Sequence, residues 1–228
     1  MWNRQQVKEQ AKIIMKRNYW KMFVVTLIAS TLTGEKTTII ERVQDFASNN
    51  HSYDAQPIFY SSNFQYIFYS FISVASILGI LYTIFIGNVI VVGKNGYFIK
   101  NHDENPELSE IFKGFKGNYL NVVKIMFLMD LKTLLWLFLF IVPGLIKAYE
   151  YSMIPYLLAE NPNLSASQAF SLSKQMTTGQ KMDLFVLDLS FLGWIILGLI
   201  CCGIGILFVL PYPEATKAEV YLILKQQV

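Results

Sequence analysis

The sequence predicts an all-α polytopic membrane protein with six transmembrane helices, arranged as three hairpins that each follow an amphipathic helix. Of the 228 residues, 54% are hydrophobic and only 15% are charged, whereas soluble domains are about 45–50% apolar and about 25% charged. The apolar residues form long blocks, and short polar segments with repeated motifs separate them. This composition excludes a soluble globular protein, a disordered chain and a nucleic-acid binder.

Residues 1–18 predict a basic amphipathic helix, because basic side chains recur every four positions while Val7, Ala11, Ile14 and Met15 recur on another face. Such a helix is suited to an anionic membrane surface. The expected membrane-surface stripe is Arg4, Lys8, Lys12, Lys16, Arg17 and Lys21. A first span follows over residues 19–33, for which a cleaved signal peptide is the alternative interpretation.

The next segments fix the expected orientation in a cell membrane. Residues 34–64 are polar and predict an extracellular loop. Tyr66–Val92 contains no charged residue and predicts the clearest transmembrane helix of the chain. Residues 93–118 are polar again and carry four lysines, so the positive-inside rule places them in the cytoplasm together with the N-terminus. The C-terminus is expected on the same side.

The second half of the chain repeats its own pattern. Glu104–Ser109 is echoed by Glu160–Ser165, and each precedes a short amphipathic helix. The first of these helices places Leu108, Ile111, Phe112 and Phe115 on one face, and Ser165 with Gln168 forms a capping box at the start of the second. The segment 159–183, like 93–118, is then cytoplasmic within a single integral membrane domain, 1–228.

The same repeat predicts two further hairpins. Asp130-Leu131-x4-Trp136 matches Asp188-Leu189-x4-Trp194, and turns are expected at Pro143-Gly144 and at 201–205. The spans are then 119–142, 145–158, 184–200 and 206–224. The alternative keeps 119–146 and 184–210 as single helices, which gives four spans and places 160–182 outside the cell. The sequence leaves both models open.

Motifs in the C-terminal half carry a resemblance to a known family. They include Pro-Tyr-Leu-Leu-Ala-Glu-Asn-Pro from Pro155, Leu-x-Leu-Ser-Phe-x-Gly-Trp from Leu187 and Thr-x-Ala-x-x-Tyr from Thr216. With them the chain resembles the DUF975 family of bacterial multi-pass integral membrane proteins and, distantly, the membrane domain of some glycerophosphodiester phosphodiesterases. Those enzymes carry catalysis in a separate soluble domain. The resemblance therefore implies location and topology and transfers no catalytic residue.

The sequence shows no constellation of catalytic or metal-binding residues. His51 and His102 fall in polar loops on opposite sides of the membrane, so they cannot share a site. The adjacent Cys201 and Cys202 are expected to be small core residues. We therefore expect no enzymatic activity, no metal and no cofactor.

Charged residues within apolar blocks form the candidate intramembrane polar site: Asp130, Lys132, Lys124 and Asp188. A charge at bilayer depth costs at least about 2.5–3.5 kcal/mol, so it normally faces a partner or a cavity. The two aspartates are interpreted either as a polar path for a proton, ion or small solute, with a lysine as counter-ion, or as salt-bridged groups that fix helix register. Lys147 and Glu150 predict a local ion pair.

These features favour a non-enzymatic membrane module that binds anionic lipids of the bilayer or a membrane or cytoplasmic protein partner. The basic N-terminal helix and the two internal amphipathic helices motivate this hypothesis. The alternative is a small transporter, or a subunit of one, with its polar path through Asp130 and Asp188.

Overall fold

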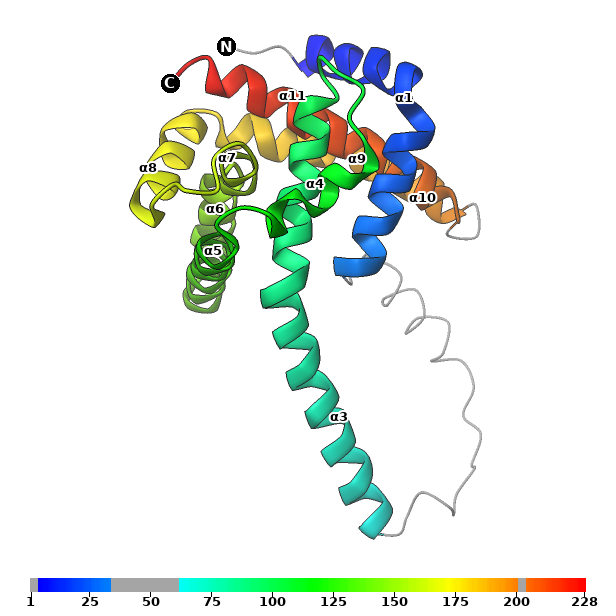
Figure 1. Cartoon of the computed structure of the whole chain (residues 1–228), viewed down its shortest axis with the longest axis vertical. Coiled ribbons are helices and arrows are strands. Elements are labelled where there is room, and N and C mark those ends of the chain that lie inside the picture. The colour runs from blue at the N-terminus through cyan, green and yellow to red at the C-terminus, as the bar shows by residue number, and fades with distance from the viewer. Residues whose placement is uncertain (1–3, 34–61, 201–203) are drawn as a thin grey trace.

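The computed structural model describes residues 4–33, 62–200 and 204–228, and its elements in these ranges are helices joined by short turns (Figure 1). The all-α class is therefore confirmed for the described part of the chain. The helices are α1 (Arg4–Thr33), α3 (Ser62–Tyr82), the π-helical turn η2 (Thr83–Gly87), α4 (Asn88–Lys100), the 3-10 helix η3 (Leu108–Phe115), α5 (Tyr119–Leu139), α6 (Ile141–Tyr151), α7 (Ile154–Glu160), α8 (Ala166–Thr177), α9 (Lys181–Ile200), α10 (Ile204–Val209) and α11 (Pro211–Lys225).

Helix α1 consists of two segments joined at a kink. Val7, Ala11 and Ile14 are buried, which confirms the predicted apolar face of the N-terminal segment. Asn18 leaves helical geometry (φ −133°, ψ 27°), and its buried side-chain amide donates a 2.9 Å hydrogen bond to Oδ1 of Asn101. The first segment packs beside α11, and the second turns away from it (Figure 1). The kink therefore falls at residue 18, where the predicted N-terminal segment ends.

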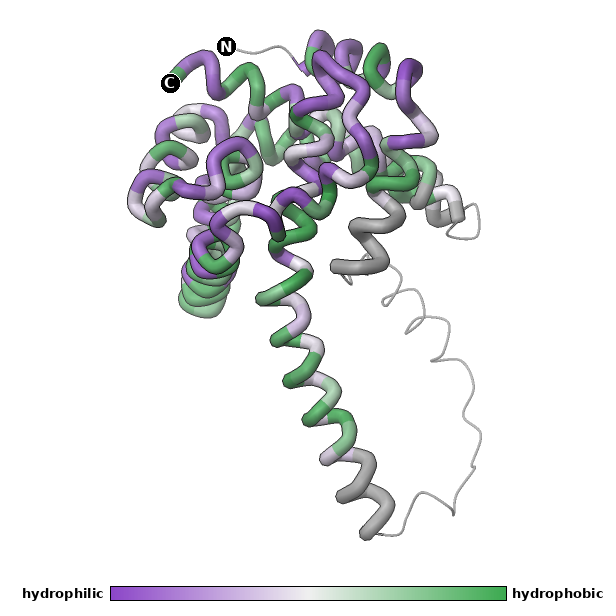
Figure 2. Tube along the Cα trace, viewed as in Figure 1, coloured by the Kyte–Doolittle hydropathy of each residue, from purple (hydrophilic) through white to green (hydrophobic). Residues whose placement is uncertain are grey.

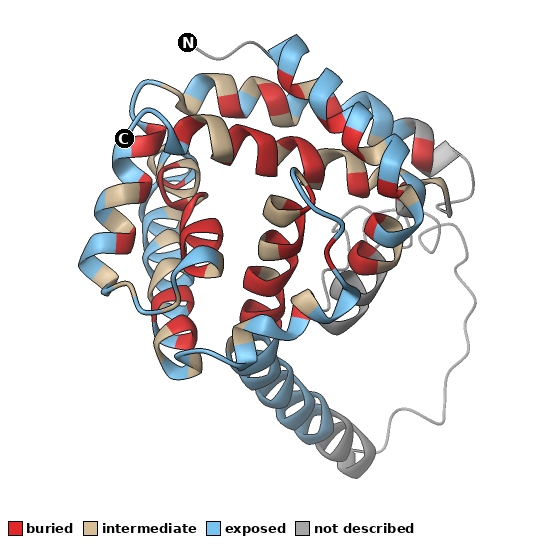
Figure 3. Ribbon diagram, turned by 45° about the horizontal axis from the view of Figure 1, so that its top comes forward, coloured by how far each residue is buried: buried red, intermediate tan, exposed pale blue. Residues whose placement is uncertain are grey.

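The longest helical run is α3, η2 and α4, which continue into one another from residue 62 to residue 100. Within the described residues, only Tyr69–Lys100 is long and apolar enough to cross a membrane. Its outer part is strongly apolar (Figure 2) and yet exposed, whereas α4 is largely buried (Figure 3). The other predicted spans are shorter or more charged: α6 has 11 residues, and α5 contains three charged residues.

The chain reverses direction at Phe140, which has an extended backbone between α5 and α6 (φ −154°, ψ 134°). The prediction of the turn at Pro143-Gly144 is wrong by about three residues, because proline is compatible with the first turn of a helix and lies in the first turn of α6. Gly144 instead allows close contact with Leu137: a Cβ atom there would lie 2.6 Å from Leu137 Cα.

The four-span alternative is wrong in its helices. Residues 119–146 do not form one helix, because α5 and α6 fold back against each other. Residues 184–210 do not form one straight helix either, because the described residues of α10 contact those of α9. Gly198 lies against Ile206 N, where a Cβ atom would approach to 2.8 Å. Of the turn predicted at 201–205, residues 201–203 lie outside the described residues. Ile204 and Gly205 belong to α10.

The two predicted internal amphipathic helices, α8 and η3, bury their apolar side chains to different extents. In α8 the capping box of Ser165 and Gln168 is present, and Ala169, Ser173 and Met176 are buried. In η3, by contrast, Ile111 is buried while Leu108, Phe112 and Phe115 remain exposed. A 3-10 helix has three residues per turn and not 3.6, so Leu108 aligns with Ile111 and Phe112 aligns with Phe115 in two adjacent rows. The predicted extracellular loop 34–64 lies outside the described residues except for its last three, which open α3.

Candidate functional site

The basic stripe on α1 divides into residues that hold the helix in place and residues that do not. Lys8 Nζ donates to Ser190 Oγ at 2.7 Å and lies 4.8 Å from the centre of the Phe191 ring. Arg17 donates to the carbonyl oxygens of Asn101 at 2.8 Å and His102 at 3.2 Å. Burial lowers the pKa of Lys8, and the neighbouring Arg4 and Lys12 lower it further. Lys8 and Arg17 therefore help to pack α1 against the other helices.

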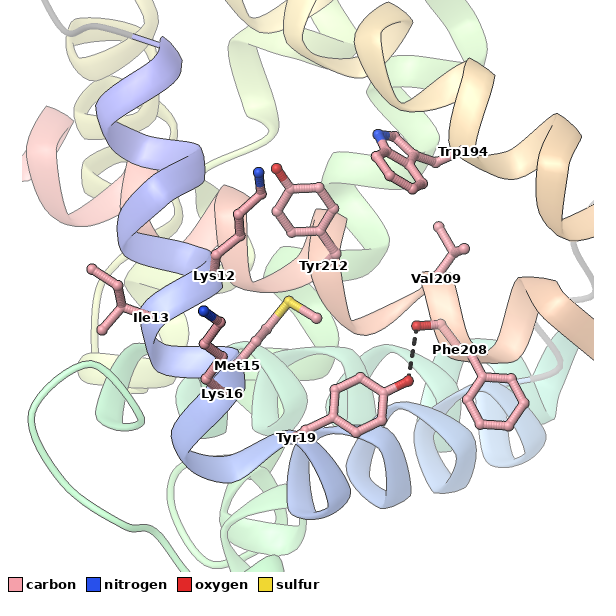
Figure 4. A pocket seen from close by; sticks show the side chains of 9 residues that line it. All are labelled: Lys12, Ile13, Met15, Lys16, Tyr19, Trp194, Phe208, Val209 and Tyr212. Carbon is pink, nitrogen blue, oxygen red and sulfur yellow. Dashed lines mark hydrogen bonds between the residues drawn. The ribbon is translucent and has the colours of Figure 1, made fainter.

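Lys12 and Lys16 instead line an open groove of about 530 Å³ between α1, α9, α10 and α11 (Figure 4). They are exposed, and no acidic side chain of the described residues lies within ion-pair distance of either ammonium group. The Tyr19 hydroxyl donates a 3.2 Å hydrogen bond to the Phe208 carbonyl at the rim. The groove, hereafter the α1 groove, is lined by Lys12, Ile13, Met15, Lys16, Tyr19, Trp194, Phe208, Val209 and Tyr212.

Charged side chains also meet where the helices pack together. Lys94 of α4 pairs with Glu214 of α11 at 2.8 Å, and their side chains are only 6% and 22% exposed. Glu150 of α6 accepts from Lys147 at 2.7 Å and from Lys181 at 2.6 Å. The predicted Lys147–Glu150 ion pair is therefore confirmed, with a third member from α9. The Lys94–Glu214 and Lys181–Glu150 pairs join helices that are far apart in the sequence. Removing one partner of a buried ion pair is strongly destabilising.

A polar cavity of about 190 Å³ lies beside the Lys94–Glu214 pair, between α4, α6, α7, α9 and α11. Asp188 lines it and pairs with Lys217 at 3.0 Å. The Tyr149 hydroxyl donates to the other carboxylate oxygen of Asp188 at 3.1 Å. Two carboxylates and two ammonium groups thus line one small cavity, which suits a polar or charged solute better than an apolar one.

The candidate polar site predicted from the sequence is distributed over separate places. Asp130 accepts a 2.7 Å hydrogen bond from Asn88 and lines a different cavity from Asp188. The Lys132 ammonium lies 3.9 Å from the centre of the Phe170 ring, and Lys124 is exposed on α5. The structure gives Asp188 the counter-ion Lys217, not Lys124 or Lys132.

Sequence reasoning missed the partners that surround Asp188. From the sequence, Lys94 is only one of the four lysines of the polar segment 93–118. Glu214 and Lys217 were not singled out. The available signal was their position: both lie within the apolar run predicted as the last span, where an unpaired charge is costly.

The helices that build this cavity largely coincide with the region recognised by a protein-family model. Residues 137–228 match the DUF975 family of proteins of unknown function. The DUF975 region begins near the end of α5 and covers α6 to α11, so it includes Glu150, Asp188 and Glu214. The basic stripe of α1 and Asp130 lie before it. No curated protein and no solved structure matches this chain.

The described residues hold no group of three or more histidine, cysteine, aspartate or glutamate side chains placed to bind a metal ion. His102 is engaged with Glu219, whose carboxylate oxygen lies 2.9 Å from Nδ1. The other histidine, His51, and the adjacent cysteines Cys201 and Cys202 lie outside the described residues.

Proposed function

We propose that this chain is a multi-pass integral membrane protein of the cell membrane, with both termini in the cytoplasm, that acts as a non-enzymatic module binding anionic lipids. The observation that carries the proposal is that one chain has both large apolar side chains exposed on several helices and a row of exposed basic side chains on α1. One of these surfaces fits hydrocarbon and the other fits anionic headgroups.

The exposed apolar side chains support a membrane environment. Phe71 on α3 is 71% exposed, and Phe138 and Ile141, at the tip of the α5–α6 hairpin, are 92% and 72% exposed. Soluble monomers rarely expose contiguous apolar patches larger than a few hundred Å². Residues 69–86, all exposed except the half-buried Ile84, extend about 27 Å as a helix, close to the roughly 30 Å of a hydrocarbon core.

The basic row supports contact with an anionic leaflet. Arg4, Lys12, Lys16 and Lys21 are exposed on α1, and each basic residue near an anionic surface contributes about 1 kcal/mol of attraction. The apolar face of the same helix is buried against protein. The helix would therefore contact the leaflet through its basic side chains, without inserting that apolar face into the bilayer.

Lipid co-purification tests this proposal. The full chain, equilibrated with mixed phosphatidylglycerol and phosphatidylcholine and purified in mild detergent, should carry more phosphatidylglycerol than the bulk mixture by mass spectrometry. A variant with glutamine at Arg4, Lys12, Lys16 and Lys21 should lose most of this enrichment. A control neutralises four exposed lysines of other elements: Lys113, Lys116, Lys174 and Lys225. Equal enrichment in the wild type and the α1 variant would refute the proposal.

The polar cavity beside Asp188 favours a second candidate function, passage of a small polar solute or proton. On this hypothesis Asp188→Asn abolishes a solute-dependent flux in reconstituted vesicles without lowering protein yield, because the cavity loses its carboxylate. Asp130→Asn, in a separate cavity, serves as the comparison and would also be inactive if the two aspartates belong to one path. Unchanged flux in both variants would eliminate the transport hypothesis.

A further inference from the structure

We propose that the α1 groove binds one anionic glycerophospholipid, with its phosphate between Lys12 and Lys16 and the start of one acyl chain along Trp194, Phe208 and Val209. This inference rests on the proposed function, because it assigns a single site within the lipid-binding surface. It goes further by separating one specific lipid from the general attraction of a basic helix for anionic headgroups.

The charges of the groove fit a phosphate. Lys12 and Lys16 are four residues apart on one helix, so their side chains are neighbours on the same face. The lining residues include no aspartate or glutamate. Two ammonium groups therefore face the groove without an acidic partner among the described side chains, and a phosphate group would supply the missing negative charge.

The walls fit hydrocarbon and not a small water-soluble anion. Opposite the two lysines lie Trp194, Phe208 and Val209 (Figure 4). Trp194 is 49% exposed and Phe208 is 45% exposed, so apolar surface remains uncovered. A volume of about 530 Å³ lies within the usual range of sites for drug-sized ligands. It can accept a headgroup with the adjoining part of one chain.

The other members of the basic stripe do not share this geometry. Lys8 is directed to Ser190 and Phe191 on α9, and Arg17 is held by backbone carbonyl groups after α4. Arg4 and Lys21 are exposed and do not line the groove. These last two residues therefore provide a matched control with the same charge and the same helix.

Native mass spectrometry of the full chain in mild detergent tests the proposal, with phosphatidylglycerol and phosphatidylcholine titrated separately. We expect one phosphatidylglycerol adduct to saturate first, at a concentration about tenfold lower than that needed for phosphatidylcholine. The Lys12→Gln/Lys16→Gln variant should need about tenfold more phosphatidylglycerol. Val209→Trp, which fills the groove without changing charge, should weaken the same adduct, and Arg4→Gln/Lys21→Gln should retain it.

The contrary outcomes distinguish failure of the groove site from failure of the proposed lipid-binding function. If the Arg4/Lys21 variant loses phosphatidylglycerol as strongly as the Lys12/Lys16 variant, binding is diffuse; the groove site is overturned and the proposed lipid-binding function stands. If the wild type has no preference for phosphatidylglycerol, both fail. A stoichiometric protein that replaces the lipid adduct and is lost with Lys12 and Lys16 would assign the groove to a protein partner and overturn the lipid site.

Discussion

Gly93→Ala is expected to destabilise the protein by about 3 kcal/mol or more, because it drives a side-chain atom into backbone. A Cβ atom at Gly93 would collide with the carbonyl oxygen of Ile111 in η3 and lie 2.6 Å from its carbonyl carbon. Backbone atoms have no alternative rotamer, so α4 and η3 would have to separate. Overpacking a core typically costs about 1–3 kcal/mol, and more when the backbone must move.

Thermal unfolding of the detergent-solubilised full chain, followed by size-exclusion chromatography of the remaining folded protein, measures this effect. A loss of about 3 kcal/mol corresponds to a fall in Tm of roughly 10 °C for a chain of this size. Gly79→Ala is the matched control, since Gly79 lies in α3 with no atom within 4 Å of the added Cβ. It should be neutral or mildly stabilising, because alanine favours helix by up to about 1 kcal/mol. Equal Tm values for the two variants would show that α4 and η3 are not in this contact.

Glu214→Gln is expected to destabilise the protein by about 3–5 kcal/mol, because it removes the carboxylate that pairs with the buried Lys94 ammonium. The Lys94 side chain is only 6% exposed, and its Nζ lies 2.8 Å from Glu214. Lys225→Gln is the comparison: that side chain is 51% exposed beside Glu160, and an exposed pair contributes about 0–1 kcal/mol.

The same thermal assay distinguishes a buried charge from a general loss of packing. Lys94→Met combined with Glu214→Leu removes both charges at similar volume, so it should recover most of the stability lost in Glu214→Gln. A double variant that is less stable than Glu214→Gln, or a Glu214→Gln variant as stable as Lys225→Gln, would contradict the buried pair.

Local patterns in the sequence predicted local structure well. The four-residue spacing of basic side chains and the row Val7, Ala11 and Ile14 are sufficient to define an amphipathic helix, since 3.6-residue periodicity depends on neighbouring positions alone. The capping box at Ser165 and the Lys147–Glu150 pair are likewise contacts between residues three apart. Each depends on one helix and needs no knowledge of the remaining fold.

The turn and the polar partners could not be predicted in the same way. Pro143 is compatible both with a turn and with the start of a helix, and only packing against Leu137 places the reversal at Phe140. Asp130 and Asp188 occupy matching places in a sequence repeat, but their partners come from different helices: Asn88 for Asp130, and Lys217 with Tyr149 for Asp188. No pattern within the repeat specifies which neighbouring helix supplies the partner.

Cysteine accessibility in intact cells tests the proposed multi-pass topology most directly. In a background with Cys201 and Cys202 replaced by alanine, Ser167→Cys reports on α8, where Ser167 is exposed, and Ser52→Cys reports on the predicted extracellular loop. With an impermeant thiol reagent, the proposal predicts labelling of Ser52→Cys in intact cells and of Ser167→Cys only after permeabilisation. Labelling of Ser167→Cys in intact cells would place α8 outside and contradict the arrangement of three hairpins with a cytoplasmic basic face.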